Sequence, residues 1–316
     1  MPEKSKRVCL DHEKLTDVNP ENLRLSRNYI ADMTLRELSP KTIYQYQKDL
    51  ETWFIYLHDN QGNPSVIGLT EDDITDFLLF CKLEGNNAER MKRRIAVISS
   101  FYKYLRKKRL IVENPVEFID RPKKGLPIVV QTFLTTDQVA IMREKLIEYG
   151  NLQLRVYALF SLSTMARVNA VANVRWKQID YDNRVVTDVI EKESKVVDLY
   201  FSEEVKRLLL ALQQYRKDKG IDDHGWVFHT GRTSDTKPIS TTTLNDWCKV
   251  IGSMIGVPTL HPHDFRHTGA SLLSNAGMSL EDVSDLLHHE STDVTRKHYV
   301  KRDKRRISQL KDQFQI

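Results

Sequence analysis

One stretch of the chain combines prolines, a glycine and charged side chains, and it limits the possible fold more than any other feature. It begins at Asn114-Pro115 and ends with the run Asp120-Arg121-Pro122-Lys123-Lys124-Gly125-Leu126-Pro127. Proline and glycine interrupt helices and strands, so we expect no single compact core to continue through this region. A length of 316 residues also favours more than one domain. We therefore predict two domains joined by a basic linker at 119–133, with a polar segment at 1–20 in front.

The first domain, expected at 21–118, shows the periodicity of amphipathic helices. Ser39-Pro40 is typical of a helix start, because serine caps the free N–H groups and proline suits the first helical position. Thr70 is expected to cap another helix, and a further helix is expected from about Ala88 to Lys107. Apolar residues follow Pro40 at the spacing of one buried helical face, namely Ile43, Tyr46, Leu50, Trp53, Phe54 and Leu57.

The last of these helices is strongly basic on its other face. No acidic residue lies between Arg90 and Arg109, and Tyr102 and Tyr104 are interleaved with the basic residues. A solvated charged face is the ordinary explanation, but this composition also suits contact with a phosphate backbone. The residues that we expect to bind DNA are Arg90, Lys92, Arg93, Arg94, Lys103, Arg106 and Lys107.

The second domain, expected at 134–316, mixes helices with a few short strands. Residues 154–163 are strongly apolar and predict a core helix. Short β-rich runs at 176–180, 184–190 and 195–201 predict strands. The fold class expected for the whole chain is mainly α with a small antiparallel β-sheet.

Composition narrows the class of protein only a little. The net charge is +5, which is compatible with nucleic acid as a partner but is common among enzymes. The three cysteines, Cys9, Cys81 and Cys248, are far apart and show no disulfide or zinc-finger spacing, so no metal site is expected. No leader peptide and no long apolar run is apparent, which favours a cytoplasmic protein without a membrane contact.

Residues suited to chemistry on phosphate are concentrated near the C-terminus. They lie in His263-Asp264-Phe265-Arg266-His267, Leu286-Leu287-His288-His289 and Lys297-His298-Tyr299. Upstream lie Arg167, in Thr164-Met165-Ala166-Arg167-Val168, and Lys192, in Ile190-Glu191-Lys192-Glu193-Ser194-Lys195. Cleavage of a phosphodiester without a metal needs fixed cations around the non-bridging oxygens, and arginine donates two parallel hydrogen bonds to them. It also needs a proton for the leaving oxygen, which lysine or histidine can supply.

These motifs, in this order and at these separations, resemble those of the tyrosine recombinases, the phage integrase family. The run from His263 to Thr268 is similar to the family's His-x-x-Arg box, and Leu286 to His289 is similar to its Leu-Gly-His box. Tyr299 lies where the nucleophile is expected, and residues 164–180 resemble the segment that carries the first arginine. The helical first domain is similar to the family's SAM-like core-binding domain, so the resemblance covers nearly the whole chain.

The resemblance implies a site-specific DNA recombinase or integrase that needs no cofactor and no metal. Its partners would be double-stranded DNA with specific core sites and further copies of the chain, as a tetramer held together by the C-terminal tail. Accessory proteins that bend the DNA are a further expectation. The implied catalytic residues are Arg167, Lys192, His263, Arg266, His289 and Tyr299.

In these roles Arg167 and Arg266 would bind the scissile phosphate, and His263 and His289 would hydrogen-bond to it. Lys192 would protonate the 5′ oxygen, with Lys195 as the alternative, and Tyr299 would form a 3′-phosphotyrosine bond. Each residue also has an ordinary explanation. Arg167 could be a buried structural arginine paired with a carboxylate, and Lys192 could belong to an exposed hairpin of alternating charge. His267 and His298 are expected to be capping or packing residues.

The sequence departs from the family pattern at several positions. Met165 replaces a glycine before the first arginine, Ala170 replaces an acidic residue that commonly supports it, and His288 replaces the glycine of Leu-Gly-His. The interval from His289 to Tyr299 is one residue longer than the commonest spacing. These departures favour an alternative, a catalytically silent DNA-binding regulator that keeps the fold. A relaxing enzyme similar to type IB topoisomerases would share the same chemistry.

Overall fold

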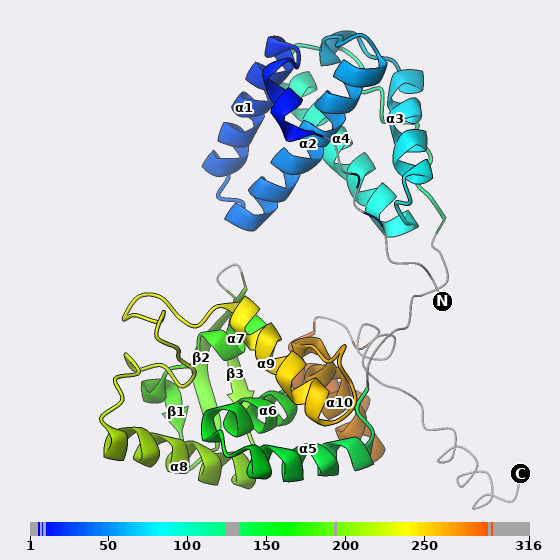
Figure 1. Ribbon diagram of the computed structural model, residues 1–316. Coiled ribbons are helices and arrows are strands. Elements are labelled where there is room, and N and C mark those ends of the chain that lie inside the picture. Colours follow the sequence, from blue (N-terminus) through cyan, green and yellow to red (C-terminus); the bar gives the residue numbers. More distant parts are fainter. Residues whose placement is uncertain are drawn as a thin grey trace, which may run out of the picture. The chain divides into compact units, whose positions relative to one another are not determined.

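The structure is a computed structural model that describes residues 6, 8, 11–123, 133–192, 195–289 and 292, without the side chain of Lys192. The chain forms two compact units, Met1–Val129 and Val130–Ile316 (Figure 1). The finer limits expected for the linker and the N-terminal segment stay predictions. No helix in the described part of the chain combines the length and the apolar character needed to span a membrane.

The first unit is built from four helices, and each begins where the sequence supplies a cap. Asn19, Ser39, Thr70 and Asn87 each accept a hydrogen bond from a backbone N–H of the first helical turn. These side chains satisfy N–H groups that have no partner within the helix. The helices are α1 (Pro20–Leu35), α2 (Pro40–Asn60), α3 (Glu71–Leu83) and α4 (Ala88–Lys107), and short 3-10 turns span His12–Thr16 and Val66–Gly68.

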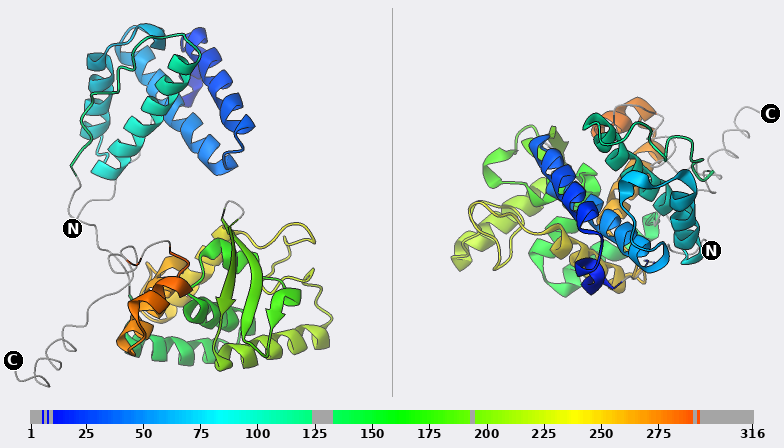
Figure 2. Two further views of the ribbon diagram at one scale, coloured as in Figure 1. Left: turned by 180° about the vertical axis from the view of Figure 1, so that it is seen from behind. Right: turned by 90° about the horizontal axis from the view of Figure 1, so that it is seen from above.

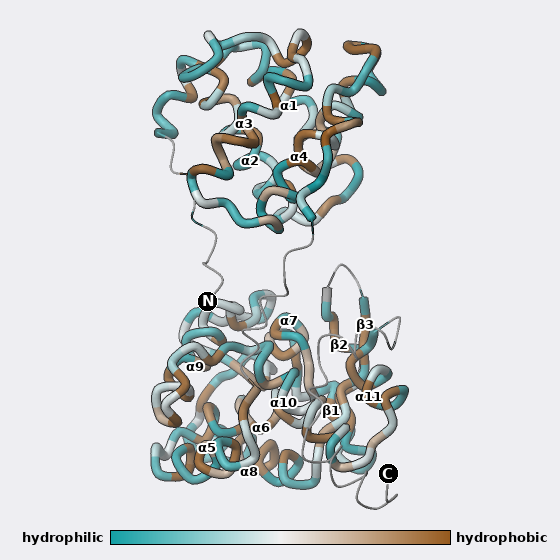
Figure 3. The backbone as a smooth tube through the Cα atoms, turned by 90° about the vertical axis from the view of Figure 1, so that its right-hand side faces the viewer, coloured by the Kyte–Doolittle hydropathy of each residue, from teal (hydrophilic) through white to brown (hydrophobic). Residues whose placement is uncertain are grey.

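Aromatic side chains fill the core of this unit. Trp53 packs edge-on against Tyr102, with ring centroids 5.9 Å apart, and the Tyr102 hydroxyl donates to the Val66 carbonyl oxygen at 2.9 Å. Tyr102 and Tyr104 are both buried. Both tyrosines therefore belong to the core rather than to the basic face of α4, and Tyr104 packs against Tyr29 with ring centroids 5.2 Å apart. Figure 3 shows hydrophobic and hydrophilic residues alternating along the helices of both units.

The second unit surrounds one helix with others and places a small sheet beside them. The helix α6 (Leu152–Thr164) is buried along most of its length and contacts α5 (Thr136–Tyr149), α8 (Glu203–Lys219) and α10 (Pro262–Asn275). Its strongly apolar sequence is explained by this central position. The remaining helices are α7 (Val168–Ala172), α9 (Thr241–Met254), α11 (Leu280–Leu286) and a 3-10 turn at Trp176–Gln178.

The sheet is antiparallel, with strand order β1 (Ile179–Asp180), β2 (Val185–Lys192) and β3 (Lys195–Tyr200). Figure 2 shows the strands from the side that the helices leave open. In β3, Val197 and Leu199 are buried while Val196 and Tyr200 are exposed, as expected for a sheet with one covered face. The predicted class, mainly α with a small antiparallel sheet, is confirmed.

A register shift interrupts β2 between Val186 and Val189. Asp188 within it has a left-handed backbone with φ of 56°. Such a bulge changes which residues face the core, and beyond it Val189 and Glu191 are buried while Ile190 is exposed. This change of face places the Glu191 carboxylate on the covered face of the sheet.

Candidate active site

The helix α10 positions His263 and Arg266. Pro262 stands at its first position, and the Asp264 carboxylate accepts from the His261 backbone N–H at 2.8 Å, which fixes the start of the helix. One turn after Arg266, Gly269 lets α10 approach α6 closely, since a Cβ there would lie 2.4 Å from the Leu162 carbonyl oxygen. Position 269 therefore admits no larger residue without a shift of backbone.

Arg266 is fully buried and joins three segments that are far apart in sequence. Its Nη1 donates to the Met165 carbonyl oxygen at 2.7 Å, and its Nη2 donates to the Leu287 carbonyl oxygen. The same Nη2 lies 3.1 Å from His289 Nε2. The guanidinium group is thus held at the meeting point of α6, α10 and the turn after α11.

Both turns that supply these carbonyls use a left-handed backbone. Met165 has φ of 53° and His288 has φ of 52°, at the two positions where the family pattern has glycine. Met165 packs in a small apolar cluster with Ala270, Val283 and Leu287. The His288 ring lies 3.0 Å from the Asp198 carbonyl oxygen, through Nε2. The departures from glycine thus keep the expected backbone turn, and each side chain has a contact of its own.

His289 is a neutral imidazole at pH 7. Burial, followed by the charges of Arg266 and Arg167, lowers its pKa to about 4. An arginine only donates, so Nε2 accepts from Arg266, and in the neutral ring the proton lies on Nδ1. The pKa of His263 is also lowered, first by burial and then by His261, Arg266 and Arg167. Both arginines therefore act on both histidines, as in a shared anion site.

His267 lies beside this group. Burial is the main cause that lowers its pKa to about 4, and its ring packs against Phe133 with centroids 5.5 Å apart. The prediction that His267 is a packing residue is confirmed.

Arg167 stands at the N-cap position of α7 and forms an ion pair with Glu191 of β2. The Glu191 side chain is 0% exposed, whereas that of Arg167 is 30% exposed. The account of Arg167 as a buried arginine is therefore wrong, although it does have a carboxylate partner. The interpretation of residues 191–193 as an exposed hairpin of alternating charge is also wrong for Glu191, because its side chain is buried. This partner was missed because the bulge at Asp188 is not visible in the sequence, although the spacing of Val189 and Glu191 was a usable signal.

The two candidate lysines stand opposite each other in the β2–β3 hairpin. Lys192 ends β2 and is paired in register with Lys195, which begins β3. Lys195 Nζ donates to the His288 carbonyl oxygen at 2.9 Å. Tyr299, His298 and the tail at 307–316 lie outside the described residues. The structure thus brings together Arg167, His263, Arg266 and His289, and it places the backbone of Lys192 on the strand next to Glu191.

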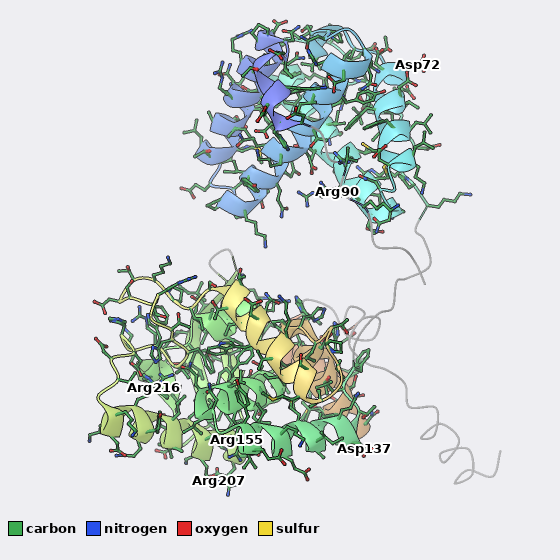
Figure 4. All side chains as sticks on the ribbon, in the orientation of Figure 1. Asp72, Arg90, Asp137, Arg155, Arg207 and Arg216 are labelled. Carbon is green, nitrogen blue, oxygen red and sulfur yellow. The ribbon has the colours of Figure 1, made fainter. Side chains whose placement is uncertain are left out.

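The basic residues of α4 differ in their surroundings. Asp49 of α2 is buried and forms ion pairs with three of them, at 2.7 Å to Arg90 Nη2, 3.1 Å to Arg93 Nε and 3.7 Å to Arg94 Nη1. Arg94 is only 2% exposed, so its expected place on a DNA-binding face is corrected. Arg90, near the start of α4 (Figure 4), and Arg93 are about one-third exposed in their side chains. Lys103, Arg106 and Lys107 are exposed, and Lys92 is partly so.

Among the residues that the structure describes, no group of three or more His, Cys, Asp or Glu side chains could hold a metal ion.

Comparisons with known proteins cover both units. The family model of the Phage integrase family matches residues 132–306, and that of the Phage integrase, N-terminal SAM-like domain matches residues 28–109. A tyrosine recombinase XerC of Lactobacillus delbrueckii subsp. bulgaricus is 29% identical over 272 residues, which are 82% of this chain and 88% of that protein. A second XerC, of Pediococcus pentosaceus, is 26% identical over 291 residues, covering 87% of this chain and 91% of the relative.

Solved structures show the same fold. A fragment of the Tn1549 transposon integrase in complex with transposon right end DNA has a TM-score of 0.69 at 16% identity, and the match covers 92% of this chain and 99% of that one. A lambda integrase dimer bound to a COC′ core site has a TM-score of 0.66 at 16% identity, covering 89% and 98%. The catalytic family model alone spans more than half of the sequence. The chain therefore belongs to the phage integrase family, the tyrosine recombinases, and is a site-specific recombinase of DNA.

Proposed function

We propose that this protein cuts and rejoins double-stranded DNA at specific core sites through a 3′-phosphotyrosine intermediate formed by Tyr299. The observation that supports this most strongly is the arrangement around Arg266, in which a buried arginine contacts a neutral histidine and a second arginine acts on the same ring. Such a group of fixed donors suits a phosphate that gains charge during reaction.

In the proposed reaction the Tyr299 oxygen attacks phosphorus, and the bond from phosphorus to the 5′ oxygen breaks. Arg167 and Arg266 hydrogen-bond to the non-bridging oxygens. The neutral imidazole of His263 accepts the phenol proton, and the Lys192 ammonium gives a proton to the departing 5′ oxygen. Lys192 is preferred over Lys195 because Lys195 is already bonded to the His288 carbonyl oxygen. The phosphotyrosine bond keeps the free energy needed for rejoining, so no cofactor is required.

On the first unit, the exposed basic residues of α4 are proposed to contact the DNA backbone. Arg90 and Arg93 both form ion pairs with Asp49. These two arginines and one carboxylate together carry a net positive charge. The proposed contacts are Arg90, Lys92, Arg93, Lys103, Arg106 and Lys107.

Assembly is the finer part of the proposal. We place the reaction in the cytoplasm, on two DNA sites, within a tetramer that forms through the C-terminal tail, with DNA-bending proteins as optional partners. The tail carries Ile307, Leu310 and Phe314 at helical spacing. Deleting residues 307–316 should lower the mass of the complex on DNA in analytical ultracentrifugation. An unchanged mass would contradict the role of the tail.

Covalent trapping tests the reaction itself. The protein is incubated with candidate DNA that carries a nick near the cleavage point, so that the released piece diffuses away and the adduct accumulates. A protein–DNA adduct on denaturing gels that disappears with Tyr299→Phe is the expected result. Tight, salt-sensitive binding without any adduct would overturn the proposal in favour of a silent regulator.

A further inference from the structure

We propose that Glu191 is a positioning residue that holds Arg167 in the orientation needed to bind the scissile phosphate. This inference rests on the function proposed above. The two side chains of this ion pair differ in exposure, since that of Glu191 is fully buried and that of Arg167 remains partly exposed. A buried carboxylate that stays ionised needs a charged partner. Arg167 is thereby tied at one side while its other side stays open to a ligand.

Two contacts fix α7 against β2. Arg167 at the start of α7 pairs with Glu191, and Asn173 at the end of α7 donates from Nδ2 to the Ile190 carbonyl oxygen at 2.9 Å. The two acceptors are consecutive residues of one strand. A short helix bound at both ends to the same strand cannot rotate without breaking one of these contacts. The direction of the Arg167 side chain is therefore set by β2.

The geometry of arginine allows it to serve both partners. A guanidinium group has five N–H donors in a rigid plane, and the contact with Glu191 is made by Nη1. The remaining donors can meet a non-bridging phosphate oxygen. Without an anchor, the long arginine side chain would sample many rotamers. The conformational entropy lost when the phosphate orders it would then weaken the binding of the transition state.

The position of Glu191 in the strand also connects two parts of the site. Glu191 directly precedes Lys192, the proposed proton donor, in β2. Arg167 and Lys192 act on the same phosphate in the proposed reaction, one on a non-bridging oxygen and one on the leaving oxygen. A carboxylate that ties Arg167 to β2 therefore fixes the first cation relative to the strand that bears the second.

The experiment uses the full-length protein, nicked DNA and single-turnover rates of adduct formation. The variants are Glu191→Gln, Arg167→Ala and the double variant, and DNA affinity is measured for each. We expect Glu191→Gln to slow cleavage about 100-fold with DNA affinity unchanged within about twofold. In the Arg167→Ala background the same change should cause no further loss, because no guanidinium is left to position. The pair formed by Arg143 and Glu204, on α5 and α8, supplies the control, since Glu204→Gln should leave the rate unchanged.

Several outcomes would overturn the inference. A wild-type cleavage rate for Glu191→Gln would do so. The inference also fails if Glu191→Gln slows the Arg167→Ala variant by the same factor as it slows the wild type, because Glu191 would then have a general structural role. If Glu191→Gln does not fold, Glu191→Asp replaces it, since it keeps the charge but shortens the reach. It should slow cleavage at least tenfold in folded protein, and a wild-type rate would contradict the proposal. If the wild type forms no adduct, the proposed function itself fails, which is a different result from a wild type that reacts and a Glu191 variant that reacts equally well.

Discussion

At the scale of single residues, the burial of Arg266 and the contacts of its guanidinium group define the site. Arg266 is buried, and its guanidinium group contacts two backbone carbonyl oxygens and the His289 imidazole. Burial is the main cause that lowers the pKa of His289 and of His263, and the positive charge of Arg266 lowers both further. At neutral pH the positive charge beside His289 is therefore carried by guanidinium groups and not by the His289 ring.

The titration of His289 follows from this environment. Its pKa is lowered from 6.5 to about 4, so the unfolded chain takes up a proton at a higher pH than the folded protein does. Stability from this group is complete above pH 6.5 and is lost as pH falls from 6.5 toward 4. We expect the His289 signal in NMR, identified with His289→Gln, to titrate near pH 4. A midpoint near 6.5 would show that the ring is solvated and free of Arg266.

The residues proposed to act on the phosphate could be predicted from the sequence, whereas the side chains that contact them could not. The motifs identified Arg167, His263, Arg266 and His289 because each motif is local in sequence. Glu191 was missed because its burial depends on a bulge in β2 and on contact with a helix some twenty residues away in the chain. Arg94 was assigned to the surface because the count of basic residues does not reveal which of them faces Asp49.

At the scale of elements, close packing of two helices sets the depth of the site. The helix α10 carries His263 and Arg266, and it lies against α6, whose C-terminal turn leads to Met165. The capping and periodicity signals predicted these helices well, since caps and apolar spacing act within one or two turns. Which helices touch was not predictable in the same way, because it depends on contacts between residues about a hundred positions apart.

Gly269→Ala tests the packing of α10 on α6. A Cβ at this position would lie 2.4 Å from the Leu162 carbonyl oxygen and 2.7 Å from Met165 Cγ. We expect the free energy of unfolding in urea to fall by about 1–3 kcal/mol, with cleavage slowed because Arg266 shifts. Gly231→Ala is the control, since a Cβ there has no heavy atom within 4 Å, and it should change stability by less than about 0.5 kcal/mol. Equal stability of the two variants would contradict this account.

The contact between α2 and α4 depends on one carboxylate. Asp49→Asn would leave Arg94 buried without its charged partner and would release Arg90 and Arg93 from their anchor. We expect a loss of about 3–5 kcal/mol in the free energy of unfolding of the first unit, measured in urea. Glu89→Gln removes an exposed partner of Lys92 and should cost less than about 0.5 kcal/mol. A small effect of Asp49→Asn would mean that Asn86, which accepts from Arg94 Nε at 2.8 Å, is sufficient alone.

At the scale of the whole molecule, each unit has a hydrophobic core of its own. The clusters around Trp53 and around Tyr157 contain residues of one unit only. The division into two domains was predictable from the proline-rich and glycine-containing stretch. Separate cores imply that each unit can fold alone, and two separately folded units that both contact DNA, as proposed, would bind it as linked ligands.

A fragment of residues 1–123 tests this independence. We expect it to unfold cooperatively in urea, because its core is complete without the second unit. Its affinity for DNA should be at least about 100-fold weaker than that of the full chain, since linked units bind the second site at a high effective concentration. Fluorescence anisotropy at one fixed salt concentration measures both affinities. A fragment that binds as tightly as the full chain would contradict the linked-ligand account.

The backbone hydrogen bonds that hold Arg266 affect how far the sequences of related proteins can diverge around it. The carbonyl oxygens of Met165 and Leu287 that accept from Arg266 belong to the peptide backbone, so a mutation of a neighbouring side chain removes neither. What evolution must preserve at positions 165 and 288 is a left-handed turn, and glycine is one solution among several. Lineages can therefore drift through methionine or histidine at these positions while the arginine stays in place. A search that demands glycine there would overlook working enzymes.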